Sequence, residues 1–545
     1  MNKSLTKNIN MKKIFILITT ISLTINALAL DIWDGSSSPW TNGSGTENDP
    51  YLIETAANLA YLAEKVNEGY QAQGQEVFHD TYFMMTDDLD LNDINWTPIG
   101  TVDMSMQGYY FGGVFDGWYH NIDHMKITSS ADVCGLFAGV GNKAVIKHLS
   151  VTNGDINSTG TGVGGIVGAA YGNSRVHQCA FSGTITVTNN GSFCGAGGIT
   201  SAAAENSFIS ECSFSGSITA TNNGGFTGAA GAGGIVGIAM DNALISSCYN
   251  TGSITASSFM LNVAAGIVAV TMQENEVFVE RCYNVGTLNG ATKGGIFGMI
   301  SPINPFKDEA SITVIGCYYL DTCGGTTNYG TSMTSSQMQS SSFVNMLNEE
   351  APITYVMDNG SNNGYPILAL YAIRIHEASD ITAHSVKLSA DIHSGNITFS
   401  RVCFEISDMD MTFFKTVDVD TDGYVETIVE DLADDTSYQY CMSVYHDGSI
   451  FLVSNTFYFT TEFDGVDELQ NTNISIYPNP TSDFIHIDCK DVPWRVSIPI
   501  NIYTLDGNLI KTVEDTNIVD VRDLNEGVYL INIGGVIKKF IVETP

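Results

Sequence analysis

The stretch Gly164-Gly165-Ile166-Val167-Gly168, followed by Cys179-Ala180-Phe181-Ser182-Gly183-Thr184-Ile185-Thr186, decides the fold, because both parts recur along the chain. Related cysteine motifs begin at four later positions: Cys212, Cys248, Cys282 and Cys317. Successive cysteines are 33, 36, 34 and 35 residues apart. A repeat of this length is typical of a solenoid, in which each unit buries its apolar face only by stacking on a neighbour.

Each repeat contains three short β-branched segments separated by glycine or Asn-Gly turns. They are the Ile-Val of the glycine motif, the run before the cysteine and the Ser-Ile-Thr after it. Three strands per turn predict an all-β fold, a right-handed parallel β-helix. The motif isoleucine precedes the cysteine by 13 residues in three successive units, whereas the interval from the cysteine to the next isoleucine varies. Variable spacing is typical of loops, so we expect recognition there.

Two neighbouring variable loops carry the same combination of amides and an aromatic ring. They contribute six candidate ligand-binding residues: Asn189, Asn190, Phe193, Asn222, Asn223 and Phe226. Stacked amides beside a ring can hold the face of a sugar. Alternatively, these residues form Asn-Gly turns whose phenylalanine packs back onto the solenoid.

The cysteines are expected to form a column in the core. The chain has 11 cysteines, and five of them occupy one repeat position. Leu149 and Met125 take the matching position in earlier units that lack cysteine. Because free cysteine packs as a small hydrophobe, this substitution favours a buried apolar column over a metal or disulfide ladder. Disulfides or oxidation sensing remain the alternatives.

The N-terminus has the features of a secretory signal peptide over residues 1–29. Lys12 and Lys13 precede an apolar run over residues 14–23, and Ala27-Leu28-Ala29 supplies the small residues of a cleavage site. The run is too short for a membrane span, and we expect no transmembrane segment later in the chain.

Helices that begin near Thr55 and Thr334 are expected to cap the two ends of the solenoid.

The charge balance restricts the partners. The chain has 22 Lys and Arg against 59 Asp and Glu, a formal net charge of −37. At long range this charge repels polyphosphates and anionic bilayers, so we expect no nucleic-acid partner. Cations, neutral glycans and basic proteins remain compatible with it.

Several motifs resemble those of GLUG-repeat proteins of the bacterial cell surface. They include Trp33-Asp34-Gly35, Phe115-Asp116-Gly117 and Gly135-Leu136-Phe137, followed by the glycine and cysteine motifs. The resemblance covers a domain of residues 31–370. It departs at Trp118-Tyr119, where family members usually carry Asn-Gly.

Residues 372–463 form a second expected domain, a small β-sandwich of alternating strands. Its Leu432-x-x-x-Thr436-x-Tyr438 motif resembles the corner of fibronectin type III modules. Cys403 and Cys441 fall on neighbouring strands, both out of phase with the core-facing residues, so a cross-strand disulfide is a candidate.

An acidic motif in this sandwich is the candidate calcium site. Asp418-x-Asp420-x-Asp422-Gly423 is similar to the start of an EF-hand loop, but the closing acid is displaced by one residue. An Asp-Gly hairpin turn is the alternative. We expect no other cofactor.

After a linker over residues 464–472, residues 473–545 form a second small sandwich. Its motifs resemble the C-terminal sorting domain of Bacteroidetes type IX secretion cargo. The residues that carry this resemblance are Pro478, Asn479, Pro480, Asp506, Gly507, Gly527, Tyr529, Lys538 and Lys539. The resemblance implies the type IX translocon as partner and export through the periplasm to the outer-membrane surface or the medium.

Taken together, these features predict an exported, adhesin-like or glycan-binding surface protein without catalytic activity, whose ligand is a host or environmental glycan or protein. One alternative is a carbohydrate-active β-helix enzyme, a polysaccharide lyase or hydrolase. Arg175, His177, Glu211, Glu280 and Arg281 lie near the cysteine column, but no two acids share a matching outward position on adjacent coils with a base beside them, so no catalytic residue is assigned. The other alternative is a purely structural surface protein.

Overall fold

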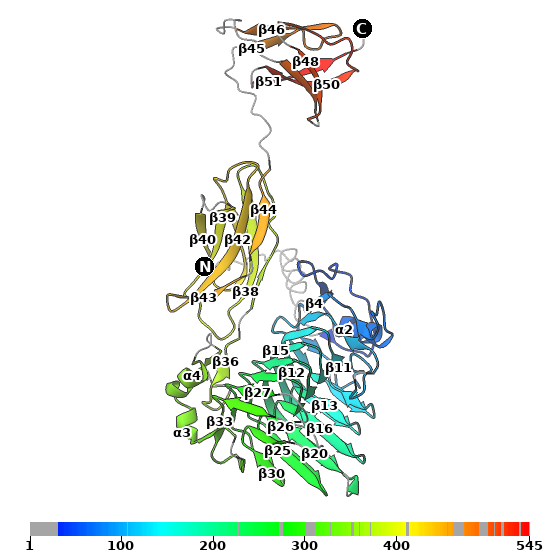
Figure 1. Cartoon of the computed structure of the whole chain (residues 1–545), viewed down its shortest axis with the longest axis vertical. Helices are drawn as coiled ribbons and strands as arrows, with labels where there is room; N and C mark the ends of the chain where they lie inside the picture. Colours follow the sequence, from blue (N-terminus) through cyan, green and yellow to red (C-terminus); the bar gives the residue numbers. More distant parts are fainter. Residues whose placement is uncertain are drawn as a thin grey trace, which may run out of the picture.

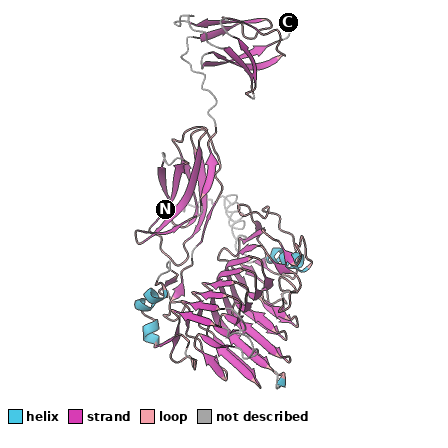
Figure 2. Ribbon diagram, in the orientation of Figure 1, coloured by secondary structure: helices cyan, strands magenta, loops and turns pink. Residues whose placement is uncertain are grey.

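The computed structural model describes residues 31–105, 107–225, 228–271, 276–300, 311–327, 329–349, 354–358, 360–370, 372–409, 414–454, 456–462, 474–489, 500–505, 507–513, 517–533 and 536–543. The predicted signal peptide and the linker at 464–472 lie outside these residues. The described chain is almost entirely β: a parallel solenoid followed by two small sandwiches (Figures 1 and 2). The predicted fold class is confirmed. No helix in the described ranges is long and apolar enough to cross a membrane.

The solenoid consists of three parallel sheets, which we name A, B and C. Sheet B has eight strands, one per coil: β3 (Glu76–Val77), β6 (Tyr110–Phe111), β11 (Phe137–Val140), β14 (Val167–Ala170), β17 (Thr200–Ala203), β21 (Val236–Ala239), β26 (Val268–Thr271) and β31 (Phe297–Ile300). Sheet C has six: β10 (Val133–Cys134), β13 (Gly162–Gly164), β16 (Phe193–Gly197), β20 (Ala229–Gly233), β25 (Leu261–Ala265) and β30 (Thr292–Gly294).

Sheet A is the largest, with 20 strands, because coils cross it in more than one segment. Its strands are β1 (Asp31–Ile32), β2 (Tyr51–Ile53), β4 (Tyr82–Met85), β5 (Leu89–Asp90), β7 (Val114–Asp116), β8 (Asn121–Asp123), β9 (Lys126–Ser129), β12 (Val145–Ser158), β15 (Arg175–Asn189), β18 (Phe208–Ser210), β19 (Ser213–Asn222), β22 (Leu244–Ser246), β23 (Tyr249–Asn250), β24 (Ser253–Ser258), β27 (Val277–Glu280), β28 (Tyr283–Asn284), β29 (Leu288–Asn289), β32 (Ile312–Ile315), β33 (Tyr318–Leu320) and β34 (Thr331–Met333).

Sheet C occupies the segments that the repeat spacing predicts to be variable loops. The prediction of three strands per coil therefore missed the strand that precedes each glycine motif. These strands are built largely from glycine and alanine, which have low β propensity. The residues of these strands are small because neighbouring backbone segments lie very close to them. For example, a Cβ on Gly197 would collide with the carbonyl oxygen of Thr200.

The cysteine column lies in the core, as predicted. Leu149 pairs in register with Cys179, and the five column cysteines are buried free thiols. The Cys212 N–H donates to the Cys248 sulfur at 3.4 Å, one coil on. The assignment of Met125 to this column is wrong. Asn121 pairs with Ser150, the residue after Leu149, and Lys126 pairs with Asp155, so Met125 lies further along the strand than the column position. The connection from Asp116 to Asn121, which contains Trp118 and Tyr119, is two residues longer than the matching connection from Lys147 to Ser150, and this shifts the register.

The N-terminal end of the solenoid is capped as predicted by α2 (Ala56–Asn67). The Thr55 hydroxyl accepts the Asn58 N–H at 3.2 Å, and Leu59, Leu62 and Val66 are buried against the first coils.

The C-terminal helices do not cover the other end. The predicted capping box at Thr334 forms, but α3 (Ser335–Met338) and α4 (Ser341–Leu347) lie on the outer face of sheet A. There Phe343 packs on Tyr283 with ring centroids 5.8 Å apart. The two helices bury aromatic rings on the outer face of the last coils that would otherwise be exposed to solvent. In the last coil, Tyr329, which does not belong to either helix, packs on Phe297.

Residues 372–462 form the predicted sandwich. One sheet contains β37 (Ala372–Ile375), β38 (Val386–His393) and β41 (Gly423–Val429); the other contains β39 (Arg401–Asp408), β40 (Phe414–Val419), β42 (Ser437–His446), β43 (Ser449–Val453) and β44 (Phe457–Thr460). The Tyr438 hydroxyl accepts the Ala433 N–H at 2.9 Å, as expected for a tyrosine corner. A two-stranded sheet, β35 (Tyr355–Val356) and β36 (Ile367–Leu368), precedes it.

The last sandwich also has two antiparallel sheets. One contains β45 (Ile474–Tyr477), β46 (Phe484–Cys489) and β49 (Ile518–Asp520); the other contains β47 (Ile500–Thr504), β48 (Leu509–Val513), β50 (Gly527–Ile533) and β51 (Val536–Val542). Their inner faces share one apolar core.

Candidate functional site

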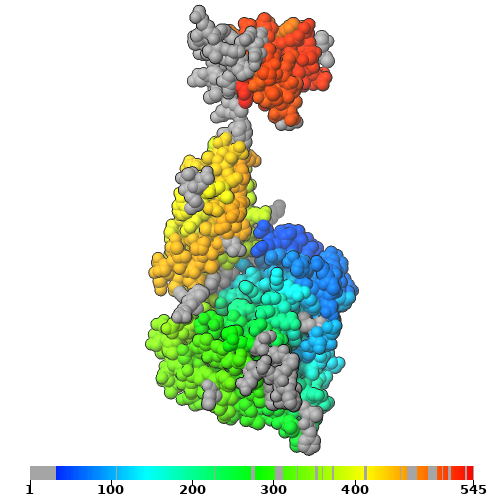
Figure 3. Space-filling model, in the orientation of Figure 1, coloured from blue at the N-terminus to red at the C-terminus, as the bar shows by residue number. Residues whose placement is uncertain are grey.

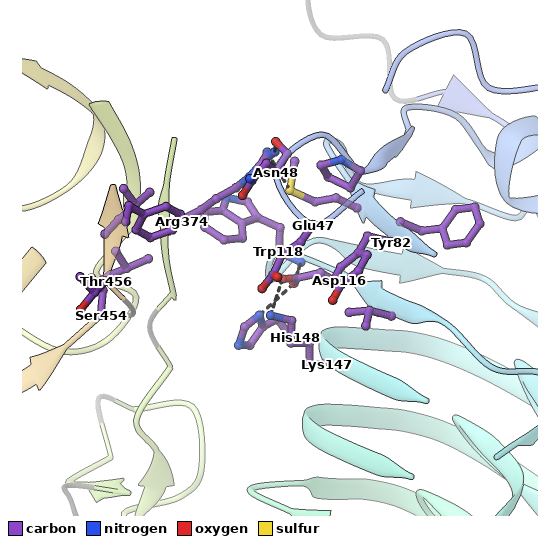
Figure 4. Close-up of a pocket in the computed structure, with 17 residues that line it drawn as sticks. Glu47, Asn48, Tyr82, Asp116, Trp118, Lys147, His148, Arg374, Ser454 and Thr456 are labelled. Atoms are coloured by element: carbon purple, nitrogen blue, oxygen red, sulfur yellow. Dashed lines mark hydrogen bonds and ion pairs between the residues drawn. The ribbon is translucent and has the colours of Figure 1, made fainter. Parts of the chain in front are cut away.

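Two cavities lie between the outer face of sheet A and the sandwich of residues 372–462. Figure 3 shows the sandwich against the solenoid, and Figure 4 shows the larger cavity. The volumes of the two cavities are about 450 Å³ and about 350 Å³. Solenoid side chains form one wall of the larger cavity and sandwich side chains form the other. We call the two cavities together the interdomain cleft. Its principal residues are Asp116, Trp118, Lys147, His148 and Arg374 in the larger cavity, and Tyr119, Gln178, Glu211 and His393 in the smaller one.

Direct contacts hold the sandwich against the first coils. The Arg374 guanidinium donates to the Asn48 carbonyl oxygen at 3.1 Å, and the Asn48 amide donates to Glu377 at 2.6 Å. The Tyr119 ring stacks on His393 of the sandwich, with centroids 5.0 Å apart. The cleft is therefore bounded by two domains that touch at defined residues.

A row of left-handed residues shapes the solenoid wall of the cleft. In each repeat, the residue before the column position has a φ between 50° and 55°: His148, Gln178, Glu211, Ser247 and Arg281. This conformation is uncommon for residues other than glycine and bends the strands of sheet A. His148, Gln178 and Glu211 line the cleft as a result.

Trp118 and Tyr119 are the most unusual part of this wall. They have φ values of 48° and 63°, two consecutive left-handed residues with bulky side chains. Each such residue costs on the order of 1–3 kcal/mol unless its surroundings compensate. The Asp116 carboxylate accepts the Trp118 N–H at 2.9 Å, and the Tyr119 N–H donates to the His148 carbonyl at 2.8 Å. These bonds fix both rings at the cleft.

Asp116 is the electrostatic centre of the larger cavity. One carboxylate oxygen lies 2.8 Å from His148 Nδ1, and the other lies 3.0 Å from Lys147 Nζ. Burial alone would raise the pKa of Asp116, but the charge and hydrogen bond of His148, the Lys147 charge and the Trp118 N–H together hold this pKa below its ordinary value. Asp116 is therefore ionised and positions its neighbours.

A polar chain continues along the wall into the smaller cavity. Tyr119 donates its hydroxyl to Gln178, and the Gln178 amide donates to Glu211 at 2.7 Å. Burial raises the pKa of Glu211, against the hydrogen bond from Gln178. His177, next to Gln178, lies 2.9 Å from the Ser210 hydroxyl. Burial, with the nearby positive charges, lowers the pKa of His177 to about 3, so this imidazole is neutral.

The cleft thus presents aromatic faces beside planar hydrogen-bonding groups and charged donors. In Figure 4 the Trp118 side chain extends from the solenoid toward Arg374 on the sandwich. Sugars offer apolar ring faces and hydroxyl edges, and stacking against aromatic rings with polar groups at the rim suits both.

The predicted binding asparagines, in contrast, use their side chains within the fold. Asn189 and Asn222 pair in register on adjacent coils. Asn189 accepts the Gly191 N–H at 2.5 Å and donates to the Thr159 carbonyl at 3.0 Å. Asn222, only 2% exposed, accepts the Gly224 N–H at 2.8 Å. Both residues hold turns.

The remaining members of that predicted site are more accessible. Asn190 and Asn223 are exposed at the turns. Phe193 begins β16 and lies over Gly195, so it packs back on sheet C. Phe226 lies outside the described residues. Ligand binding at Asn190 and Asn223 stays a prediction.

The three aspartates of the candidate calcium motif have separate environments. Asp418 pairs with Arg401 at 2.7 Å, and Asp422 accepts the Ser394 N–H at 2.7 Å. Asp420 lies in the connection from β40 to β41, which crosses between the two sheets and is not a hairpin. In the described ranges, no three His, Cys, Asp or Glu side chains lie close enough to share a metal ion.

The predicted disulfide does not form, because Cys403 and Cys441 are both free. Cys403 pairs in register with Ser443, and Cys441 pairs with Glu405. The two cysteines are therefore diagonal neighbours, whose Cα atoms lie about 7–8 Å apart, beyond the usual range of a disulfide.

The C-terminal motif residues hold the last sandwich together. The Asn479 side chain donates to the Lys539 carbonyl at 3.0 Å and so joins the proline-rich segment to β51. The Tyr529 hydroxyl donates to Asn525 at 2.9 Å, and its ring stacks on Phe540. Asp506 lies outside the described residues. The other residues of the motif lie on the same domain: Pro478, Pro480, Gly507, Gly527 and Lys538.

Residues 475–543 match the family described as "Secretion system C-terminal sorting domain". The chain carries a type IX sorting domain. This domain indicates handling by the type IX secretion machinery and export to the cell surface or the extracellular space. Residues 159–186 match "The GLUG motif", which confirms the resemblance to GLUG repeats for this part of the solenoid.

Other similarities cover smaller parts of proteins. The chain is 29% identical over 162 residues to "Putative Gly-rich membrane protein" of Evansella cellulosilytica, and the match covers 28% of this chain and 17% of that protein. The chain thus spans about a sixth of this relative. The sensor domain of the anti-sigma factor RsgI4 of Pseudobacteroides cellulosolvens is 19% identical with a TM-score of 0.15, over 17% of this chain and 95% of that one. A two-domain fibronectin type III segment of chicken tenascin is 16% identical with a TM-score of 0.20, over 32% of this chain and 100% of that one.

Sequence reasoning noted His177 and Glu211 near the cysteine column without assigning them a role, and it missed the cleft itself. Asp116 belongs to the Phe115-Asp116-Gly117 motif, but nothing in the sequence marks Lys147 and His148 as its neighbours on the next coil. Arg374 joins them from the second domain. One signal was present: the Asn-Gly of the GLUG pattern, well suited to a left-handed turn, is replaced by two aromatic residues at Trp118-Tyr119.

Proposed function

We propose that this exported protein binds glycans, without transforming them, in the interdomain cleft. The observation that carries the proposal is the left-handed Trp118-Tyr119 pair. Glycine or asparagine would adopt this backbone with less strain, so the two rings are retained at a cost to stability. Strained residues cluster at functional sites, and this pair lines both cavities.

The separation of the acidic groups favours binding over hydrolysis. A glycoside hydrolase uses two carboxyl groups about 5–10 Å apart, one of them with a raised pKa. Glu211 and Asp116 have pKa values displaced in opposite directions. However, the register Asp116–Lys147–His177–Ser210 places them three coils apart, about 14 Å along the solenoid axis. This pair does not meet the requirement.

We also propose that the sandwich of residues 372–462 is a fibronectin type III-like module and that the chain comes from a member of the Bacteroidetes. The two-sheet topology and the corner at Tyr438 support the first point. The sorting domain supports the second. In this view the module is a spacer that also forms one wall of the glycan site.

A panel of immobilised plant, microbial and mucin glycans tests the function. The exported full chain is expected to be retained on one class of glycan and to release no reducing ends from it. Release of reducing ends would contradict the non-catalytic proposal and favour an enzyme. Absence of both retention and release would favour a structural role.

A further inference from the structure

The charge of the interdomain cleft differs from that of the chain. The chain has 59 acidic residues and 22 basic ones. The larger cavity is lined by two permanent cations, Lys147 and Arg374, by His148 and by two acids, Asp116 and Glu47. Glu47 is exposed at the rim. The interior of the cavity is therefore locally basic on an acidic protein.

Arg374 has no acidic partner among the described residues. Among the five arginines in the described ranges, Arg281, Arg401 and Arg522 each pair with a carboxylate. Arg374 donates instead to the Met84 sulfur at 3.3 Å and to a carbonyl oxygen, and it forms no ion pair with a described carboxylate. Arg175 is also unpaired, but it is exposed, over the ring of Phe208.

A half-buried guanidinium without an anion is electrostatically incomplete. It has lost part of its hydration, and neutral oxygen and sulfur acceptors compensate for the charge only in part. The planar fork of Arg374 retains N–H groups that can bind a carboxylate or sulfate with two hydrogen bonds.

Lys147 supplies a second cationic donor from the opposite wall. Its partner Asp116 is already shared, because His148 occupies the other carboxylate oxygen. One ammonium group has three donors, so Lys147 can bind an external anion while it keeps Asp116. In Figure 4 the Trp118 ring extends from the solenoid wall toward Arg374, on the same side of the cavity as Lys147.

We propose that the glycan bound in the cleft is acidic, with its carboxylate or sulfate group held by Arg374 and Lys147 while a sugar ring stacks on Trp118. This inference rests on the proposed glycan-binding function. The net charge of −37 opposes such a ligand only weakly, because at physiological ionic strength exposed charges further than about 8 Å from the ligand are largely screened. Contacts inside the cleft are screened much less.

The test measures the affinity of the full chain for three oligosaccharides of equal length: a galacturonate, a sulfated galactan and a neutral galactan. We expect binding of at least one acidic oligosaccharide, tighter than that of the neutral one. Arg374→Gln should weaken the acidic ligand about tenfold to hundredfold and change the neutral ligand less than twofold. Arg374→Lys keeps the charge but loses the fork and should give an intermediate loss.

The matched control is Arg175→Gln, which removes the other unpaired arginine outside the cleft and should leave both affinities unchanged. Equal weakening of acidic and neutral ligands by Arg374→Gln would overturn the inference, because Arg374 would then only dock the sandwich. Binding of the neutral oligosaccharide alone would also overturn it and leave the proposed function standing. Binding of none of the three would count against both.

Discussion

Two rows of turns run along the same solenoid and differ in what their side chains do. In one row, Asn189 and Asn222 repeat the same residue and use it to accept backbone N–H groups. In the other row, the backbone conformation is left-handed in every coil, but the residue type changes from His148 to Gln178 to Glu211. A repeated residue indicates a structural need of each coil. Chemical variety on a constant backbone indicates a surface shaped for a ligand.

Among changes to the turns, the largest effect is expected from Trp118→Asn, in the left-handed pair beside this row. Loss of the ring should weaken glycan binding about 30-fold, equivalent to about 2 kcal/mol. Asparagine tolerates the left-handed backbone, so the free energy of unfolding should stay the same or rise by up to about 1 kcal/mol. Titration calorimetry and urea unfolding measure the two quantities.

Lys143→Asn is the matched control for this change. Lys143 also has a left-handed backbone, with a φ of 72°, but it is exposed and does not line the cleft. The Lys143→Asn variant should be slightly more stable than the wild type and should bind the glycan equally well. A Trp118→Asn variant that binds like the wild type would remove the functional distinction between the cleft wall and the asparagine turns.

His177, which precedes Gln178 of the left-handed row, should make the fold sensitive to acid. In the folded chain its pKa is lowered to about 3; in the unfolded chain it is about 6.5. Between these values only the unfolded chain binds the proton, so the stability falls as the pH drops below about 6.5. From pH 7 to pH 5 this amounts to about 2 kcal/mol. His177→Asn should lose correspondingly less stability over that interval in urea unfolding; an unchanged pH dependence would contradict the assignment.

The asparagine row should show the opposite pattern. Asn222→Ala removes the acceptor of the Gly224 N–H from a side chain that is 2% exposed. The free energy of unfolding should fall by about 1–2 kcal/mol. Glycan affinity should stay within twofold. Asn222→Asp, which keeps an acceptor at this position, serves as the control for size.

The smallest effect is expected from the exposed members of that row. Asn190→Ala and Asn223→Ala should each change the free energy of unfolding by less than about 0.5 kcal/mol, because these side chains are exposed. Retention on the glycan panel should be unchanged. A clear loss of retention in the double variant would restore the turns as the binding site.

Much of the fold is predictable from the repeat. The glycine and cysteine motifs mark strands and columns directly, and the match of Leu149 to Cys179 follows from spacing alone. Sheet C was missed because its strands are short or rich in glycine and alanine, as in β16 and β20, which lack β-branched residues. The position of α4 was missed because the sequence does not show that the Tyr283 ring points to the outer face of sheet A. Stacking of the coils places the ring there, and α4 packs on it.

The cleft was less predictable for a physical reason. Arg374 and Trp118 are 256 residues apart, and they meet only because the sandwich lies against the first coils. Local patterns report turns and strands, not the contacts between domains. The two aromatic residues in place of Asn-Gly were the one local departure that pointed to the site.

The central claim is that the glycan lies between Trp118 and Arg374. A crystal structure of the full chain with the tightest-binding oligosaccharide tests it most directly. We predict density for a sugar ring against the Trp118 indole, with its acidic group within hydrogen-bonding distance of Arg374. Density over the turns at Asn190 and Asn223, with an empty cleft, would contradict it.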